Sequence, residues 1–187
     1  LFMTIFVAIA IIILTLFTTG FFVAAEFATV SARRTKIYQL ASQNDPLAKL
    51  LLPVLEDSRR LEHYVAACQI GITISTLILG AFARESIAGR LAGPITQLFG
   101  DSLSIAATGR LGQALSIALV LILVAALQVI LGELFPKSLA LQYPESIARA
   151  VAWPMRLALL VFSLPIWLFT MTARLILRLL GQREQDF

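Results

Sequence analysis

The chain carries little charge for its length. Only 14% of its 187 residues are charged, whereas a soluble domain carries about 25%, so an ordinary globular surface could not be covered. The 15 Lys and Arg outnumber the 11 Asp and Glu, but the basic residues flank long uncharged stretches. A nucleic-acid binder would cluster them on one wetted face. Water is therefore not the main solvent of this chain, and we expect no nucleic-acid partner.

Cysteine is almost absent, which limits the chemistry available. Cys68 is the one cysteine, so neither an intrachain disulfide nor a metal site built from several cysteines can form. The sequence also shows no nucleophile paired with a base and no phosphate-binding glycine loop, and we predict that the chain is not an enzyme. Because it starts at Leu1 rather than Met and stops among charged residues, we expect it to be part of a longer protein.

Long uncharged stretches are what the sequence has instead. Residues 1–25, 64–83 and 111–132 carry no charge. About 20 helical residues cross the roughly 30 Å of hydrocarbon in a bilayer, and a helix satisfies its own backbone polar groups there. A fourth uncharged stretch, 157–173, is shorter and contains Pro165, which lacks an amide hydrogen and kinks or breaks a helix. The predicted spans are about 3–25, 64–83 and 112–133.

The basic residues are unevenly divided by these spans. Twelve Lys and Arg lie between the first and second spans or after the third, and three lie between the second and third. Basic residues are in excess on the cytoplasmic side, so we predict an outer N-terminus and a cytoplasmic C-terminus. A full fourth crossing would carry Arg174, Arg178 and Arg183 to the outer side. We therefore predict that 157–180 is a kinked helix at, or dipping into, the inner leaflet.

The connecting segments complete the predicted fold. Residues 32–60 are expected to form cytoplasmic helices broken near Asn44-Asp45-Pro46, a turn followed by a proline at a helix start. The glycine-containing segment 84–110 is expected to form an outer loop with one short helix. Together these features predict a single all-α integral membrane domain over 1–187. It would have three transmembrane helices and juxtamembrane helices at about 32–60 and 138–180, the C-terminal one kinked at Pro165.

Glu133 is the first of two acidic residues at the ends of spans, where ionisable side chains are costly and often functional. In an α-helix the amide of residue 136 would bond the carbonyl of Gly132, but Pro136 has no amide hydrogen. A free carbonyl beside a carboxylate, at the negative end of a helix dipole, suits a hard cation. The alternative is an interfacial Glu133–Lys137 pair at i,i+4, with Gly132 and Pro136 simply ending the helix.

Polar side chains also follow one face of the second span. Gln69, Thr73, Thr76 and Gly80 are spaced 4, 3 and 4 residues apart, and Ser75 is the other polar residue near them. With Gly80 allowing close approach, this face favours either helix packing or the lining of an ion path. Together with Glu133, these oxygens could supply a six-ligand Mg²⁺ site or a looser Na⁺ site.

Glu26 is the second acidic residue, at the inner end of the first span, and Ser31 follows it. Glu26 either snorkels to the interface or caps the helix, or it supports the same ion site from a third helix.

Three stretches resemble the signature motifs of the transmembrane domain of the CorC/CNNM family, hemolysin-related proteins implicated in Mg²⁺ and Co²⁺ efflux. The resemblance is nearer to the bacterial CorC branch than to the animal one, and covers essentially the whole chain. The most specific part is the run from Gly132 to Ser138. The stretches are Gly20-Phe-Phe-Val-Ala-Ala-Glu26, Gln69-Ile-Gly-Ile-Thr73 and Leu131-Gly-Glu-Leu-Phe-Pro-Lys-Ser138.

The resemblance implies a homodimer in the bacterial inner membrane that holds a largely dehydrated Mg²⁺ between three helices, with export coupled to Na⁺. By motif, Glu133 would be the carboxylate ligand, Gly132 a carbonyl ligand, and residues 69–76 the source of polar ligands. Other members have Ser and Asn where Ala24, Ala25, Ile72 and Thr76 stand here. The hydroxyls that could compensate are those of Ser31, Thr73 and Ser75.

Longer members of the family continue into cytoplasmic CBS domains that bind adenine nucleotide. These domains are absent from this chain, so we expect no ATP binding by it. The predicted function is divalent cation transport, in the first place Mg²⁺ efflux, with the lipid bilayer, a second copy and the cation as partners. The alternative is a membrane-embedded ion sensor, or an anchor for cytoplasmic regulatory domains, without transport. A pore-forming haemolysin would need a conductive path that nothing in the sequence lines.

Overall fold

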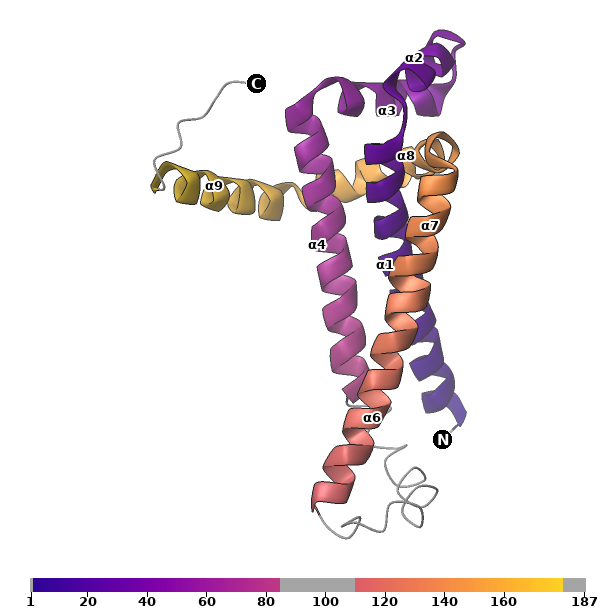
Figure 1. Cartoon of the computed structure of the whole chain (residues 1–187), viewed down its shortest axis with the longest axis vertical. Coiled ribbons are helices and arrows are strands. Elements are labelled where there is room, and N and C mark those ends of the chain that lie inside the picture. Colours follow the sequence, from indigo (N-terminus) through magenta and orange to yellow (C-terminus); the bar gives the residue numbers. More distant parts are fainter. Residues whose placement is uncertain (1, 85–109, 180–187) are drawn as a thin grey trace. The chain divides into compact units, whose positions relative to one another are not determined.

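The computed structural model describes residues 2–84 and 110–179, and every element within these ranges is helical (Figure 1). The predicted all-α class is confirmed for this part of the chain. The predicted outer loop with its short helix falls almost wholly on residues 85–109, outside the described ranges. The elements are α1 (Phe2–Ser31), α2 (Arg34–Ser42), α3 (Pro46–Glu56), α4 (Ser58–Phe82), α6 (Arg110–Gln128), the π-helix η2 (Val129–Leu134), α7 (Phe135–Gln142), α8 (Pro144–Val161) and α9 (Ser163–Leu179).

Three helical stretches are long and apolar enough to cross a membrane, as the sequence predicts: Ile9–Ser31, Ser58–Phe82 and Ile117–Gln142. The first continues through Glu26 to Ser31, and the third continues through Pro136 to Gln142. Glu26 therefore does not end the first helical stretch, and Pro136 does not end the third. The prediction placed helix ends at these residues because it took the uncharged stretch as the limit of each span.

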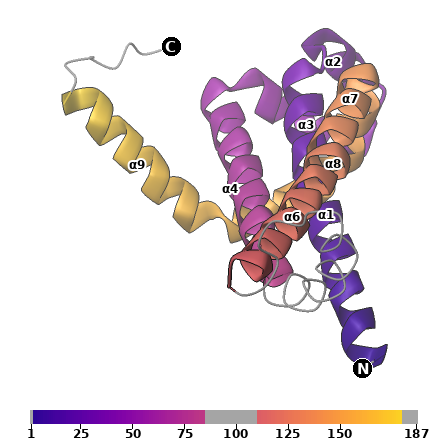
Figure 2. The same ribbon diagram turned by 60° about the horizontal axis from the view of Figure 1, so that its bottom comes forward.

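The C-terminal helices are bent, as predicted, but the break precedes the proline. The axes of α8 and α9 differ by 69°, and up to four spans are present if this bent pair counts as one (Figure 2). Helix α8 ends at Val161, four residues before Pro165, because Pro165 has no amide to bond the Val161 carbonyl. Pro165 then occupies the first turn of α9, where a missing amide costs little.

The described residues divide into two compact units. Unit 1 comprises Leu1–Gly20 and Ile72–Pro136, and unit 2 comprises Phe21–Gly71 and Lys137–Phe187. The two long helices α1 and α4 therefore contribute one part to each unit. Each unit is described by itself below.

Unit 2 has a core made mostly of alanine, to which helices α1, α2, α3, α7 and α8 contribute. Small side chains let helix backbones approach closely, and Ile37 and Leu51 fill the space between them. This core orders the segment that the sequence predicts as juxtamembrane helices. Its buried residues are Ala28, Ile37, Ala41, Ala48, Leu51, Ala140, Ala148 and Ala152.

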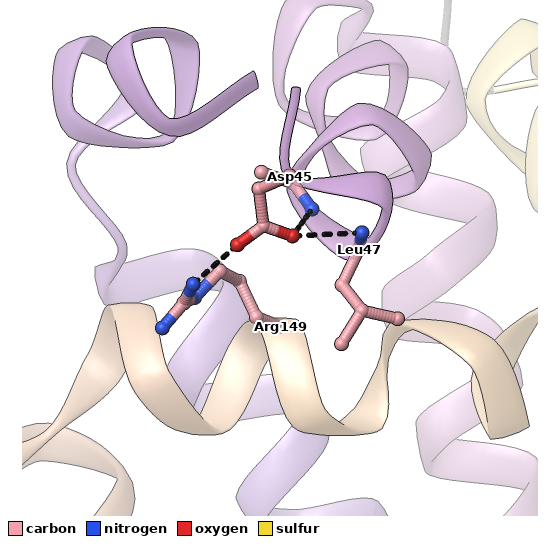
Figure 3. A network of polar contacts seen from close by, with 4 residues as sticks. Asp45, Leu47 and Arg149 are labelled. Atoms are coloured by element: carbon pink, nitrogen blue, oxygen red, sulfur yellow. Dashed lines mark hydrogen bonds and ion pairs between the residues drawn. The ribbon is translucent and has the colours of Figure 1, made fainter. Parts of the chain in front are cut away.

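The break between α2 and α3 lies where the sequence predicts it. Asn44 has a positive φ of 68°, which asparagine tolerates better than most residues. The Asp45 carboxylate then caps α3 by accepting hydrogen bonds from the amides of Leu47 (2.9 Å) and Ala48 (3.2 Å). The same carboxylate bonds Arg149 of α8, which ties the α2–α3 turn to α8 (Figure 3).

Candidate ion site

A buried hydrogen bond joins the second and third candidate spans within unit 1. Gln128, at the end of α6, is 8% exposed and donates from Nε2 to Thr76 Oγ1 of α4 at 2.7 Å. This bond leaves the amide oxygen Oε1 of Gln128 as a further acceptor. The sequence indicated Thr76 as a site residue but missed Gln128. The signal that could have found it is a lone amide side chain one helical turn before Gly132.

The backbone after Gln128 is a π-helix rather than the α-helix that the sequence analysis assumed. In η2 the amide of Phe135 donates to the carbonyl of Ile130, five residues earlier. Pro136 would be the next donor, and it has no amide hydrogen. The missing amide therefore takes the donor from Leu131 in the π register, where an α-helix would have taken it from Gly132, and short π-helical segments are frequent at functional sites.

Helix α1 approaches η2 closely at two glycines, again within unit 1. A Cβ atom at Gly20 would lie 3.0 Å from Cγ of Pro136, 3.7 Å from the Leu131 oxygen and 3.8 Å from the Gly132 oxygen. A Cβ atom at Gly132 would lie 3.4 Å from Cγ2 of Thr19. Both carbonyl oxygens therefore lie near α1, where a larger residue at position 20 would crowd them.

Two buried threonines of α1 lie on this side of unit 1. Thr15 and Thr19 are 6% and 0% exposed, and each hydroxyl donates to its own helix, Thr19 to the Thr15 carbonyl at 2.9 Å and Thr15 to the Ile11 carbonyl at 2.8 Å. Their oxygens keep acceptor capacity after donating. Neither residue was predicted from the sequence as a site residue, because threonines in an apolar helix commonly bond their own backbone in this way.

The remaining predicted residues of unit 1 lie on η2 and α4. Glu133 is half-buried in η2. Among the described residues of unit 1 it is the only one with an acidic side chain. On α4, Thr73 is exposed, Thr76 is half-buried and Ser75 is 5% exposed. The buried face of α4 in the single chain therefore includes Ser75, which lies off the predicted polar face.

The prediction that Gly80 allows close helix approach is wrong for the described residues. A Cβ atom at Gly80 would have nothing within 4 Å. Close approach occurs instead at Gly20 and Gly132 in unit 1, and at Gly71 in unit 2, where a Cβ atom would lie 2.4 Å from the ring of Phe22. Spacing along one helix shows which residues share a face, but not which face meets a neighbour.

Glu26, Ser31 and Gln69 belong to unit 2, so their inclusion in a site with Glu133 stays a prediction. Glu26 and Ser31 are half-buried, and Gln69 is exposed. Lys137, the alternative partner that the sequence offers for Glu133, is also in unit 2. Its Nζ atom lies 4.3 Å from the centre of the Phe27 ring, a cation–π contact.

The atoms of unit 1 that could bind a metal ion are therefore oxygens of several kinds. They include an amide, hydroxyls, backbone carbonyls and one carboxylate. Hard cations such as Mg²⁺ prefer oxygen ligands, whereas softer metals prefer His and Cys. Within the described ranges no group of three or more His, Cys, Asp or Glu side chains comes together.

Comparison with known proteins decides the family. The model of the cyclin M transmembrane N-terminal domain matches residues 9–186. The chain belongs to this CNNM family. CNNM domains are membrane domains associated with Mg²⁺ transport, and the candidate spans of this chain agree with an integral membrane protein.

The CNNM domain found here is also similar to individual bacterial and cyanobacterial proteins. It is 36% identical over 165 residues to the protein YhdT of Bacillus subtilis, covering 87% of this chain and 33% of that protein. It is 33% identical over 167 residues to sll0260 of Synechocystis, covering 89% and 35%. A polyamine export protein of Haemophilus influenzae is 25% identical over 177 residues, covering 95% and 38%. The chain thus spans about a third of the length of these relatives.

Proposed function

We propose that this CNNM domain exports Mg²⁺ through an intramembrane site around Glu133. The observation that carries the proposal is the π-helix η2, followed by Pro136, which lacks the amide hydrogen that would bond the Leu131 carbonyl in this register; the half-buried carboxylate of Glu133 lies in the same turn. Mg²⁺ takes six oxygen ligands at about 2.0–2.1 Å. A backbone carbonyl that lacks its helical donor is a ligand available to a dehydrated cation.

The Thr76–Gln128 pair supplies the second part of the proposed site. Its hydrogen bond fixes α4 against α6 one turn before Gly132, and both side chains carry oxygens suited to a hard cation. Thr73 and Ser75 of α4 are proposed as further hydroxyl ligands. Glu26, Ser31 and Gln69 are proposed to join from unit 2 in one state of the transport cycle.

Orientation, assembly and coupling form the rest of the proposal. The uneven division of basic residues supports an outer N-terminus in the bacterial inner membrane. The family resemblance supports a homodimer, coupling to Na⁺, and Co²⁺ as a second cargo. Alternating access would move the Glu133 site between the two faces of the membrane.

Two other functions compete with Mg²⁺ export. One is an ion sensor or anchor for regulatory domains, which would bind cations without flux. The other is polyamine export, suggested by the name of the Haemophilus relative. A polyamine carries several ammonium groups spaced along a chain, whereas the proposed site uses two carboxylates, Glu133 and, in one state of the cycle, Glu26, which together balance the double charge of Mg²⁺. This charge count favours a compact cation.

Ion-dependent protection of the purified chain tests the site. Mg²⁺ should raise the melting temperature of the wild type in neutral detergent, because a ligand that binds only the folded state stabilises it. Glu133→Gln should remove this increase. Glu62→Gln, at an exposed position of α4, is the matched control and should retain it. Equal protection of the Glu133→Gln variant would overturn the site, and protection by spermidine but not Mg²⁺ would favour a polyamine cargo.

A further inference from the structure

Unit 2 contains a cavity whose lining combines apolar walls with three basic side chains. Its volume is about 320 Å³, it is open to one side, and it is lined by residues of α3, α4 and α8. Lys49, Arg60 and Arg156 contribute the charges, and none of the described lining residues is acidic. Ligand pockets in proteins commonly measure about 300–1,000 Å³, so this cavity has the size of a small polar group with a few attached carbons.

The basic side chains of the cavity are only partly neutralised by protein groups. Lys49 Nζ donates to the neutral Asn44 Oδ1 at 2.6 Å. Arg60 pairs with Asp57 at 3.3 Å, but both side chains are well exposed, and such ion pairs contribute little and exchange readily. The Arg156 side chain makes neither an ion pair nor a hydrogen bond with any described residue. The lining therefore favours an anion.

The rest of the lining is apolar except for one buried hydroxyl group, that of Tyr64. Leu51, Pro53 and Leu159 are among the apolar residues that form the walls. Tyr64 also lines the cavity and is 2% exposed, and its hydroxyl lies near that of Thr29, in a geometry poorer than that of a normal hydrogen bond. An anion carrying a hydrocarbon part would satisfy both kinds of surface, whereas a bare inorganic anion would leave the apolar walls without a partner.

The position of the cavity along α4 indicates where that ligand comes from. Arg60 and Tyr64 lie in the first two turns of the candidate span Ser58–Phe82, which places them at the level of lipid headgroups. On α8, Leu157 follows the lining residue Arg156, and Leu160 follows the lining residue Leu159. Leu157 and Leu160 are 48% and 68% exposed. Basic pockets beside spanning helices are typical sites for anionic lipid headgroups.

We propose that this cavity binds the glycerophosphate end of an anionic phospholipid. The phosphate lies among Lys49, Arg60 and Arg156, the glycerol and first methylene groups contact the apolar walls, and the acyl chains leave along the exposed apolar surface of α8. The lipid then ties α3 and α8 to the start of α4. The proposal uses residues of unit 2 alone and does not depend on the ion site around Glu133.

Lipid-dependent thermal stability in neutral detergent tests this proposal. Phosphatidylglycerol added to mixed micelles should raise the melting temperature of the wild type, and phosphatidylcholine should not. Arg156→Gln should weaken the apparent affinity for phosphatidylglycerol about tenfold, since it removes a charge-assisted contact. Arg33→Gln removes the same charge from an exposed position outside the cavity lining and should behave as the wild type.

A second variant separates loss of binding from loss of folding. Leu159→Trp fills the cavity without changing charge, and it should also reduce the effect of phosphatidylglycerol. Equal responses to the two lipids, or an unchanged response in both the Arg156→Gln and Leu159→Trp variants, would overturn the proposal. Glycerol phosphate without acyl chains should be ineffective. Full stabilisation by glycerol phosphate would instead assign the cavity to a soluble phosphate compound and overturn the lipid.

Discussion

Gln128 of α6 donates a hydrogen bond of 2.7 Å to Thr76 of α4, and it does so one helical turn before Gly132. The bond links two candidate spans at the level of the π-helix that contains Glu133. It thus serves both the packing of unit 1 and the proposed ion site.

A double-mutant cycle measures how strongly this bond couples the two helices. Gln128→Leu and Thr76→Val should each destabilise the chain, and the coupling free energy should be about 0.6 kcal/mol, the average for hydrogen bonds between helices in membranes, and at most about 1.7 kcal/mol. Denaturation in mixed micelles provides the measurement. Strict additivity of the two changes would show that the bond contributes nothing to stability.

Glycine substitutions test the close approach of α1 to η2. Gly20→Ala should destabilise the chain by about 1–3 kcal/mol, because its Cβ atom would lie 3.0 Å from Cγ of Pro136. Gly80→Ala is the matched control in the same unit. No atom of a described residue lies within 4 Å of its Cβ position, so alanine there should be neutral or slightly stabilising. Equal effects of the two variants on thermal stability would contradict the packing described.

Replacing Pro136 tests the role of the η2 carbonyls, one of which lacks its helical donor because of this proline. Pro136→Ala supplies an amide that can bond a carbonyl of η2, so Mg²⁺ should protect the variant at concentrations about tenfold higher than the wild type needs. Circular dichroism should show that helix content is kept. Pro154→Ala, which changes a proline inside α8 of unit 2, is the control and should leave Mg²⁺ protection unchanged. Undiminished protection of the Pro136→Ala variant would show that these carbonyls are not ligands.

The Asp45–Arg149 contact predicts a dependence of stability on pH. Hydrogen bonds from the amide of Ala48, followed by the bond and charge of Arg149 and the amide of Leu47, lower the pKa of the Asp45 carboxyl in the folded chain, against a smaller opposing effect of burial. A carboxyl with a lowered folded pKa stabilises the fold fully above its unfolded pKa of about 3.9. That stabilisation is lost as the pH falls through the lower folded value.

Two substitutions at Asp45 separate the ion pair from the helix cap. Asp45→Asn keeps an N-cap side chain but loses the charge, so the stability difference from the wild type should be largest near neutral pH and should shrink below about pH 4. Asp45→Ala should lose about 0.5–2 kcal/mol more, because it also removes the cap. A difference between wild type and Asp45→Asn that does not change with pH would contradict the account.

Much of this fold could be predicted from sequence because the membrane imposes simple rules. Uncharged stretches of about 20 residues predicted the candidate spans, and Asn44-Asp45-Pro46 predicted the turn between α2 and α3. The end of α8 could have been placed more accurately. A proline removes the donor for a carbonyl four residues earlier, so Pro165 predicts a break near Val161 rather than at itself.

The candidate site was only partly predictable, since it depends on contacts between helices. The Gly132–Pro136 spacing predicted a freed carbonyl, but not the π-helical register, in which the carbonyl that lacks a donor is that of Leu131. Periodicity placed Thr76 on a polar face, yet Gln128 becomes a partner only when α4 and α6 meet. Gly80 illustrates the same limit, because a small residue allows close approach but does not attract a neighbour.

Ion flux in proteoliposomes tests the central claim, Mg²⁺ transport through a site around Glu133, most directly. Vesicles containing the wild-type chain and a Mg²⁺-sensitive dye should show Mg²⁺ movement that follows an imposed Na⁺ gradient. Vesicles with equal amounts of Glu133→Gln should show only the leak of empty vesicles, and Glu62→Gln should match the wild type. Equal Mg²⁺ flux in the wild type and Glu133→Gln, or no flux above the leak in either, would contradict the account.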